Sequence, residues 1–123
     1  MYLPHERGVL GEELAFCHVK RLGYKVLLRN FRCPLGEIDL IAKHKGVLVF
    51  IEVKTRTSEA CGFPLESVTR EKRQQMRRVA QYYIKRYGIY EAPCRFDVVA
   101  VLMRHAESVE IEMVENAFGE NEC

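Results

Sequence analysis

Apolar positions along the chain recur with two different spacings, and these divide it into helices and strands. Helical spacing predicts a first helix over residues 9–22, which Gly23 stops. It predicts a second helix that ends at Tyr87, with Thr69 as its N-cap. Alternating or continuous apolar runs predict strands over residues 24–31, 37–43, 47–55, 96–103 and, more weakly, 109–114.

The order of these segments predicts one α/β domain, αβββαβ(β). Residues 44–46 form the turn of a hairpin, and short loops make sequential strands antiparallel neighbours. The second helix crosses over between the third and fourth strands, which makes those two strands parallel. We therefore expect a mixed sheet with helices on both faces, spanning residues 1–116, and a frayed acidic tail over residues 117–123.

Composition agrees with one globular domain, since the 123 residues are 48% hydrophobic and 29% charged. Five scattered cysteines, with no C-x-x-C spacing, favour reduced thiols over a disulfide framework or a structural zinc site. Reduced thiols are typical of the cytoplasm. We predict neither a signal peptide nor a membrane span, because no apolar stretch is long enough.

The charge is distributed unevenly, although the formal net charge is only +2. All 19 Lys and Arg residues lie at or before Arg104, among 11 acidic residues, whereas the rest of the chain has six Glu and no Lys or Arg. The body is therefore basic, which is compatible with a polyanionic partner such as DNA.

The strongest chemical signal comes from the two strands of the predicted hairpin. Asp39 lies on the first strand, and Glu52 and Lys54 share one face of the second. Two carboxylates of neighbouring strands can share a hard divalent cation, while the ammonium contacts water or phosphate. The alternative is a structural salt bridge of Lys54 with either acid.

A third acid, Glu12, lies on the first helix amid Ala15, Phe16 and Val19, which follow it at helical spacing. A carboxylate in an apolar sector usually has an ion or ligand partner, so Glu12 is a candidate third member of the site. The alternative is an acid that stabilises the positive end of the helix dipole.

Several motifs in chain order carry a resemblance to a known family. They are Gly11-Glu12-x-x-Ala15, Gly23-Tyr24, Asn30, Gly36-Glu37-Ile38-Asp39-Leu40-Ile41, Phe50-Ile51-Glu52-Val53-Lys54-Thr55-Arg56, Lys72 and Arg95-Phe96-Asp97-Val98. Together they resemble the YraN family of small bacterial proteins, which is similar to Holliday-junction resolvases within the PD-(D/E)XK nuclease superfamily. The resemblance covers about residues 8–101.

The resemblance implies a restriction-endonuclease-like α/β/α sandwich and a nuclease site that uses Mg²⁺ or Mn²⁺. Asp39 and Glu52 would be metal ligands, Lys54 the catalytic lysine, and Glu12 the helix acid that assists the metal site. Ile38 stands where the superfamily's name has a proline. By analogy with resolvases, whose junction substrate has two-fold symmetry, a homodimer is expected.

Basic residues supply candidate contacts to nucleic acid. Four arginines of the second helix are predicted to lie opposite its apolar stripe, where they track phosphates or form a solvated face: Arg70, Arg73, Arg77 and Arg78. Arg56 follows the strand motif directly, and Lys72 lies near the start of the helix, where an anion can bind. Asp97 is predicted to be structural, holding Arg95.

The sequence thus favours a Mg²⁺- or Mn²⁺-dependent endonuclease acting on DNA, including branched DNA. The alternative is a nucleic-acid-binding module that keeps the fold without turnover. A third reading is a protein-interaction subunit in which the acids are structural. Fold resemblance alone does not separate these functions.

Overall fold

The computed structural model describes residues 4–56, 68–105 and 108–118, and it confirms the predicted order of elements. Most of the predicted loop between Arg56 and Val68 lies outside the described residues. The helices and strands are α1 (Pro4–Arg21), β1 (Lys25–Cys33), β2 (Gly36–His44), β3 (Val47–Arg56), α2 (Arg70–Tyr87), β4 (Cys94–His105) and β5 (Ser108–Phe118).

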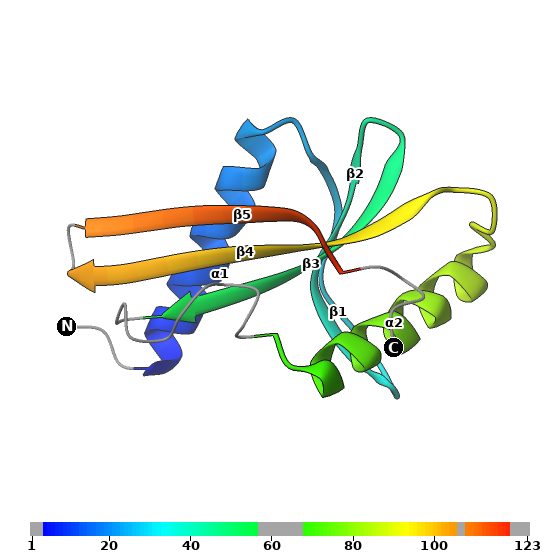
Figure 1. Ribbon diagram of the computed structural model, residues 1–123, viewed down its shortest axis with the longest axis horizontal. Coiled ribbons are helices and arrows are strands. Elements are labelled where there is room, and N and C mark those ends of the chain that lie inside the picture. The colour runs from blue at the N-terminus through cyan, green and yellow to red at the C-terminus, as the bar shows by residue number, and fades with distance from the viewer. Residues whose placement is uncertain (1–3, 57–67, 106–107, 119–123) are drawn as a thin grey trace.

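The five strands form one mixed sheet in the order β1-β2-β3-β4-β5. β3 and β4 are parallel, as the helical crossover between them predicted, and all other neighbours are antiparallel. In Figure 1, α1 lies behind β3, β4 and β5, and α2 lies at the lower right, in front of part of β1. The fold is therefore α/β, consistent with the expected restriction-endonuclease-like sandwich.

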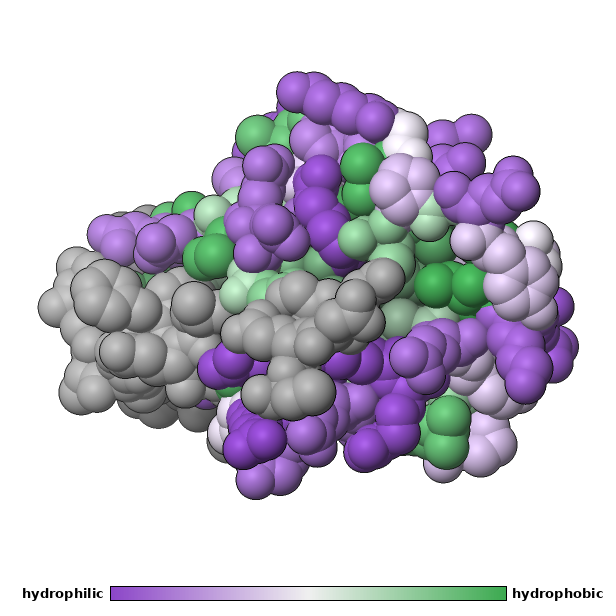
Figure 2. Space-filling view, turned by 45° about the vertical axis from the view of Figure 1, so that its right-hand side comes forward, coloured by the Kyte–Doolittle hydropathy of each residue, from purple (hydrophilic) through white to green (hydrophobic). Residues whose placement is uncertain are grey.

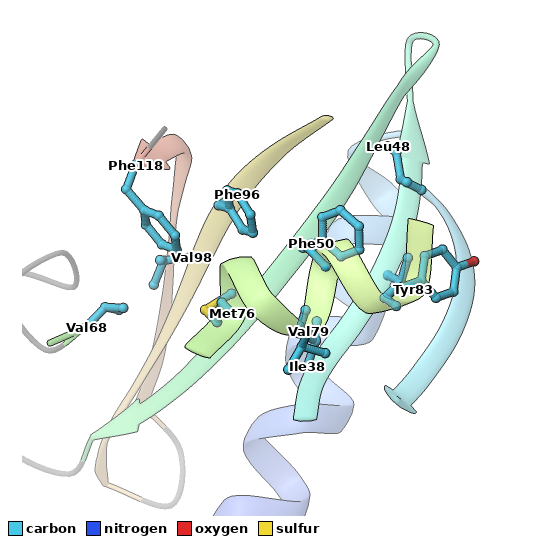
Figure 3. Packing of buried hydrophobic residues seen from close by; sticks show 12 residues of the cluster. Ile38, Leu48, Phe50, Val68, Met76, Val79, Tyr83, Phe96, Val98 and Phe118 are labelled. Atoms are coloured by element: carbon cyan, nitrogen blue, oxygen red, sulfur yellow. The ribbon is translucent and has the colours of Figure 1, made fainter. Parts of the chain in front are cut away.

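The face of the sheet that carries α2 is packed with aromatic and aliphatic side chains (Figure 3). Phe50 of β3 lies at its centre, with ring centroids 5.9 Å from Tyr83 and 5.7 Å from Phe96. Met76 and Val79 of α2 are fully buried beside them, as their helical spacing predicted. This packing fixes α2, and hence the position of its first turn, relative to β3.

The opposite face carries α1. Ala15 and Val19 of the helix are fully buried against a second apolar cluster, to which β3 contributes Val49 and Ile51. Since β3 also contributes Leu48 and Phe50 to the α2 side, this strand is covered on both faces. Polar side chains at its end are therefore placed by packing on two sides.

The ends of α2 agree with the caps expected from the sequence. The Thr69 hydroxyl accepts a hydrogen bond from the backbone N–H of Lys72 at 3.2 Å, which satisfies one free donor of the first turn. At the other end, Gly88 has a φ of 66°, a left-handed conformation that glycine adopts without strain. The helix therefore begins and ends where the sequence predicted.

The last strand is longer than predicted. β5 continues to Phe118, beyond the expected strand end at Val114 and the expected domain boundary at Asn116. Phe118 is buried, and its ring stacks on Phe96 with centroids 4.8 Å apart. This aromatic contact holds a segment whose polar sequence gave no strand signal, so the predicted fraying of residues 117–118 is wrong. Residues 119–123 lie outside the described part of the chain.

The visible surface is mainly hydrophilic, with a narrower band of apolar side chains between polar ones (Figure 2). Neither helix of the described residues is both long and apolar enough to cross a membrane. Of the cysteines, Cys17, Cys33 and Cys94 fall in the described residues, and they form no disulfide there.

Candidate active site

The site lies where the backbone ladder between β2 and β3 ends. Paired residues of these strands run from His44 and Val47 to Leu40 and Ile51. Asp39 comes one residue farther along β2, and its carboxylate accepts a hydrogen bond at 2.8 Å from the backbone N–H of Val53, two residues beyond Ile51. A side chain thus takes the place of a backbone acceptor, and the two strands separate beyond it.

Asp39 lies next to Glu52, which is only 4% exposed, so the structure brings together the two acids of the hairpin. Burial, followed by the charge of Glu52, raises the pKa of Asp39 to about 7, although the hydrogen bond from Val53 acts in the opposite direction. Asp39 therefore gains or loses its proton near neutral pH.

Two lysines partly compensate the negative charge of the Asp39–Glu52 pair. Lys54 Nζ lies 3.2 Å from Glu52 Oε2, and Lys72 Nζ lies 3.8 Å from Glu52 Oε1. Lys54 is on the same strand as Glu52, whereas Lys72 comes from the first turn of α2. Lys72 also donates to the side-chain oxygen of Gln75 at 3.3 Å.

Glu12 approaches the same end of the sheet from α1. Gly11 lies so close to Thr55 at the end of β3 that a Cβ would collide with the threonine hydroxyl. Burial raises the pKa of Glu12, and the charges of Glu37 and Glu52 raise it further, while Arg29 lowers it. The helix acid is therefore electrostatically linked to the pair.

The three acids do not form a closed cluster. Within the described ranges, no three Asp, Glu, His or Cys side chains converge closely enough to hold a metal ion. The structure therefore brings Asp39 and Glu52 together directly, while Glu12 acts on them at longer range. The expected role of Glu12 as a third ligand stays a prediction.

The arginines of α2 are not equivalent, which corrects the expectation that all four share a solvated face. Arg70 and Arg78 are exposed. Arg73 is half-buried and donates from Nε to the carbonyl of Val68 at 3.1 Å, and Arg77 lies over the ring of Phe118 at 5.3 Å. The last two were misplaced because they flank the apolar stripe. Their guanidinium groups pack against the ends of neighbouring segments.

Other basic residues lie around the site. Arg56 is half-buried and donates to the carbonyl of Thr55 at 3.2 Å. An open hollow adjoins Lys72, and it is lined by Arg32, Cys33, Gly36, Glu37, Lys72 and Gln75. The sequence interpretation missed Gln75 and Arg32. The glycine at position 36 was the sequence signal for this close approach, because a Cβ there would lie 2.7 Å from the Gln75 side chain.

A second polar group lies apart from the candidate site and was also missed as a unit. Asp97 of β4 is fully buried and pairs with Arg95, Nε to Oδ1, at 3.0 Å, as predicted. It also accepts hydrogen bonds from the Tyr24 hydroxyl at 2.8 Å and from the backbone N–H of Asn116 at 2.9 Å. The ring of His44 stacks on Tyr24 at 4.0 Å.

Burial, and then the hydrogen bond to Asp97, raises the pKa of Tyr24, so its hydroxyl keeps its proton and donates it. The sequence motifs contained Tyr24, Arg95 and Asp97, but nothing in their spacing showed that they meet. Among the described residues, no buried side-chain nitrogen or oxygen lacks a partner. Asp97 is thus fully satisfied by fixed groups of the protein.

Comparison with known proteins agrees with the motif assignment. The model of a family described as "Uncharacterised protein family UPF0102" matches residues 11–101, which include Glu12, the hairpin acids and Asp97. This chain belongs to the UPF0102 family. The YraN family predicted from the motifs is thereby confirmed.

Relatives match over nearly the whole chain. A UPF0102 protein of Caldicellulosiruptor saccharolyticus is 46% identical, over 92% of this chain and 97% of its own length. The UPF0102 protein of Moorella thermoacetica is 47% identical, over 91% and 94%, and that of Geotalea uraniireducens 45% identical, over 90% and 87%. UPF0102 relatives therefore have about the same length as this chain.

Proposed function

We propose that this UPF0102 protein is a metal-dependent endonuclease that hydrolyses phosphodiester bonds in DNA, including branched DNA. One observation carries the proposal. Asp39 and Glu52 lie side by side at the opened end of two strands, with the Lys54 ammonium on Glu52. The salt bridge of Lys54 uses only Glu52, whereas two adjacent carboxylates can supply two ligands of one cation.

The donor set fits Mg²⁺ or Mn²⁺. Mg²⁺ sites commonly use one or two carboxylates, with water and substrate phosphate as the remaining ligands. Asp39 and Glu52 would supply these two carboxylates, and a cation beside them would offset the charge of Glu52, which is one of the causes, after burial, of the raised pKa of Asp39. A bound divalent cation supplies two things there: it lowers the pKa of a water molecule and neutralises charge on the phosphate.

The chain's own residues would orient the reaction. The Val53 N–H fixes the orientation of the Asp39 carboxylate through a 2.8 Å hydrogen bond. Lys54, held by Glu52, presents an ammonium that orients the attacking water and stabilises charge as it develops on the phosphate. Glu12 of α1 interacts electrostatically with Glu52, and it would act on the site through a water molecule.

DNA would approach over the start of α2 and the end of β3. Arg70 is exposed at the start of α2, and Arg56 at the end of β3 is half-buried. Arg78 is exposed farther along α2. Each phosphate contact that is lost should flatten the dependence of log affinity on log salt by about one unit. Arg73 and Arg77 should contribute less, because they already contact Val68 and Phe118.

A non-catalytic DNA-binding module with the same fold is the second candidate. The two lysine contacts to Glu52 favour it, because they offset part of the acidic charge without any metal. The two candidates differ in turnover. A binding module needs Lys54 for stability or affinity, whereas an endonuclease needs it chiefly in the transition state.

The test is a cleavage assay with linear duplex, flap and four-way-junction DNA in Mg²⁺ or Mn²⁺. Lys54→Met should lower the cleavage rate by about 100-fold or more, because it removes an electrostatic contact made in the transition state. Its DNA affinity should stay within about threefold of wild type, since DNA binding draws on many cations. Lys43→Met, at an exposed lysine of β2, is the matched control and should cleave normally.

Two results would contradict the proposal. Equal cleavage by wild type and Lys54→Met would place the activity in another site or a contaminant. Clear DNA binding by wild type without cleavage of any substrate would favour the binding module.

A further inference from the structure

Lys72 is positioned between two alternative partners. Its ammonium lies 3.8 Å from Glu52 Oε1 and 3.3 Å from the side-chain oxygen of Gln75. Lys54 contacts the other oxygen of Glu52 at 3.2 Å and belongs to the same strand. The contact of Lys72 is therefore the longer of the two, and it joins separate elements, which makes it the easier one to break.

Space for a second position of this ammonium exists next to it. The open hollow beside Lys72 has a volume of about 410 Å³, and Gln75 and the exposed Arg32 also line it. Gly36 lets the Gln75 side chain lie close to the β2 backbone, because a Cβ there would collide with Gln75. An ammonium that left Glu52 would retain Gln75 as an acceptor and would gain access to solvent. The hollow thus combines the cations of Lys72 and Arg32, the amide of Gln75 and the carboxylate of Glu37, which contacts Arg32 at 3.0 Å.

We propose that Lys72 is an exchangeable partner of Glu52. When a divalent cation binds between Asp39 and Glu52, the Lys72 ammonium leaves Glu52 and turns into the hollow, where it binds a phosphate group of DNA. This rests on the proposed function. The reason is electrostatic: the cation supplies the positive charge that Glu52 needs, and it repels an ammonium held on the same carboxylate. Lys54, which contacts Oε2, stays in place.

The exchange couples metal binding to DNA binding. Lys72 and the metal compete for Glu52, so removing the ammonium should strengthen metal binding. Because linkage is reciprocal, the metal should in turn increase the contribution of Lys72 to DNA affinity. A lysine fixed on Glu52 would contribute equally to DNA affinity with and without metal.

The experiment compares Lys72→Gln with Lys85→Gln. Lys85 is an exposed lysine in the last turn of the same helix, so this control loses the same charge without a contact to Glu52. Titration of Mn²⁺ by calorimetry should show binding to Lys72→Gln about fivefold tighter than to the control. Lys72→Arg, which keeps a cation, should return the Mn²⁺ affinity to that of wild type.

DNA affinity is then measured by fluorescence anisotropy with a short labelled duplex, in Ca²⁺ and in EDTA. In Ca²⁺, Lys72→Gln should bind about fivefold more weakly than Lys85→Gln. In EDTA the two variants should agree within about twofold, because Lys72 then stays on Glu52.

The outcomes separate this inference from the proposed function. An equal loss of DNA affinity in Ca²⁺ and EDTA overturns the exchange, as does Mn²⁺ binding to Lys72→Gln that is no tighter than to Lys85→Gln. In both cases the endonuclease proposal stands. If wild type binds no Mn²⁺, the exchange and the proposed metal site fail together.

Discussion

Asp97 and the Asp39–Glu52 pair are buried acids of one sheet, but their charges are compensated in opposite ways. Asp97 is fully buried and is held by a guanidinium, a phenol hydroxyl and a backbone N–H, all within 3.0 Å. The pair has two like charges next to each other, and its lysine contacts are 3.2 and 3.8 Å. In the pair, burial and the charge of Glu52 raise the pKa of Asp39 to about 7.

This difference in compensation gives a physical reason to expect different roles for Asp97 and for the Asp39–Glu52 pair. A buried carboxylate that is satisfied by fixed groups of the protein contributes to holding β4 and β5 together. Two buried carboxylates that repel each other cost stability, and such an arrangement is typical of a site whose missing charge comes with a ligand. The comparison therefore supports a role for Asp39 and Glu52 that Asp97 does not share.

The largest expected effect is on stability when Asp97 is removed. Asp97→Ala leaves the Arg95 guanidinium buried beside unpaired groups, and breaking a buried ion pair in this way costs about 3–5 kcal/mol. Urea denaturation would measure it. A loss below about 1 kcal/mol would mean that Asp97 is no more structural than an average surface residue.

Asp39→Asn should raise the stability of the folded protein, whereas Asp97→Ala should lower it. The folded protein keeps a proton on Asp39 up to a pKa of about 7, whereas the unfolded chain releases it near the ordinary value of 3.8. Wild-type stability therefore falls as the pH rises between these values, by up to about 1.4 kcal/mol per pH unit. The asparagine variant lacks this fall and should be more stable than wild type at pH 8 by on the order of 2 kcal/mol.

This prediction is checked by urea denaturation in EDTA at pH 5 and pH 8, with the exposed Glu71→Gln as the control. The advantage of Asp39→Asn should be small at pH 5 and large at pH 8. An advantage that does not change with pH would show that like-charge repulsion is not its source.

A divalent cation should remove the stability cost of the Asp39–Glu52 pair and should leave Asp97 unaffected. Mn²⁺ at ten times its dissociation constant should stabilise wild type by about 1.4 kcal/mol, because it binds only the folded state. Thermal unfolding with and without Mn²⁺ would detect this. The gain should vanish in Asp39→Asn and in Glu52→Gln and persist in Glu13→Gln. Its persistence in both site variants would place the cation elsewhere.

The smallest effect is expected for an exposed ion pair, which sets the scale for the others. Glu13 contacts Arg29 at 2.7 Å, but their side chains are 55% and 38% exposed. Glu13→Gln should change the free energy of unfolding by less than about 1 kcal/mol, since solvent screens such pairs. A change as large as that of Asp97→Ala would show that burial is the wrong criterion for separating these acids.

Much of the fold could be predicted because its signals are local. Apolar periodicity gave the order of elements, and the crossover rule made β3 and β4 parallel. Thr69 and Gly88 have the local chemistry that caps α2. Phe118 was missed because its strand is held by a ring contact with Phe96, 22 positions earlier in the chain, rather than by an alternating pattern.

The site could be predicted in part for the same reason. A tight hairpin fixes its own register, so Asp39 and Glu52 could be placed together from the sequence. Contacts between distant elements could not be placed, such as Lys72 of α2 on Glu52 or Tyr24 on Asp97. These depend on how each helix and loop packs against the sheet, which the spacing of residues within one segment does not encode.

The central claim is that Asp39 and Glu52 share a divalent cation, and a crystal structure of wild type soaked in Mn²⁺ tests it most directly. The account predicts one anomalous-scattering peak coordinated by both carboxylates, with Lys54 still on Glu52. Soaked crystals with no such peak, in which Lys54 and Lys72 both remain on Glu52, would contradict it.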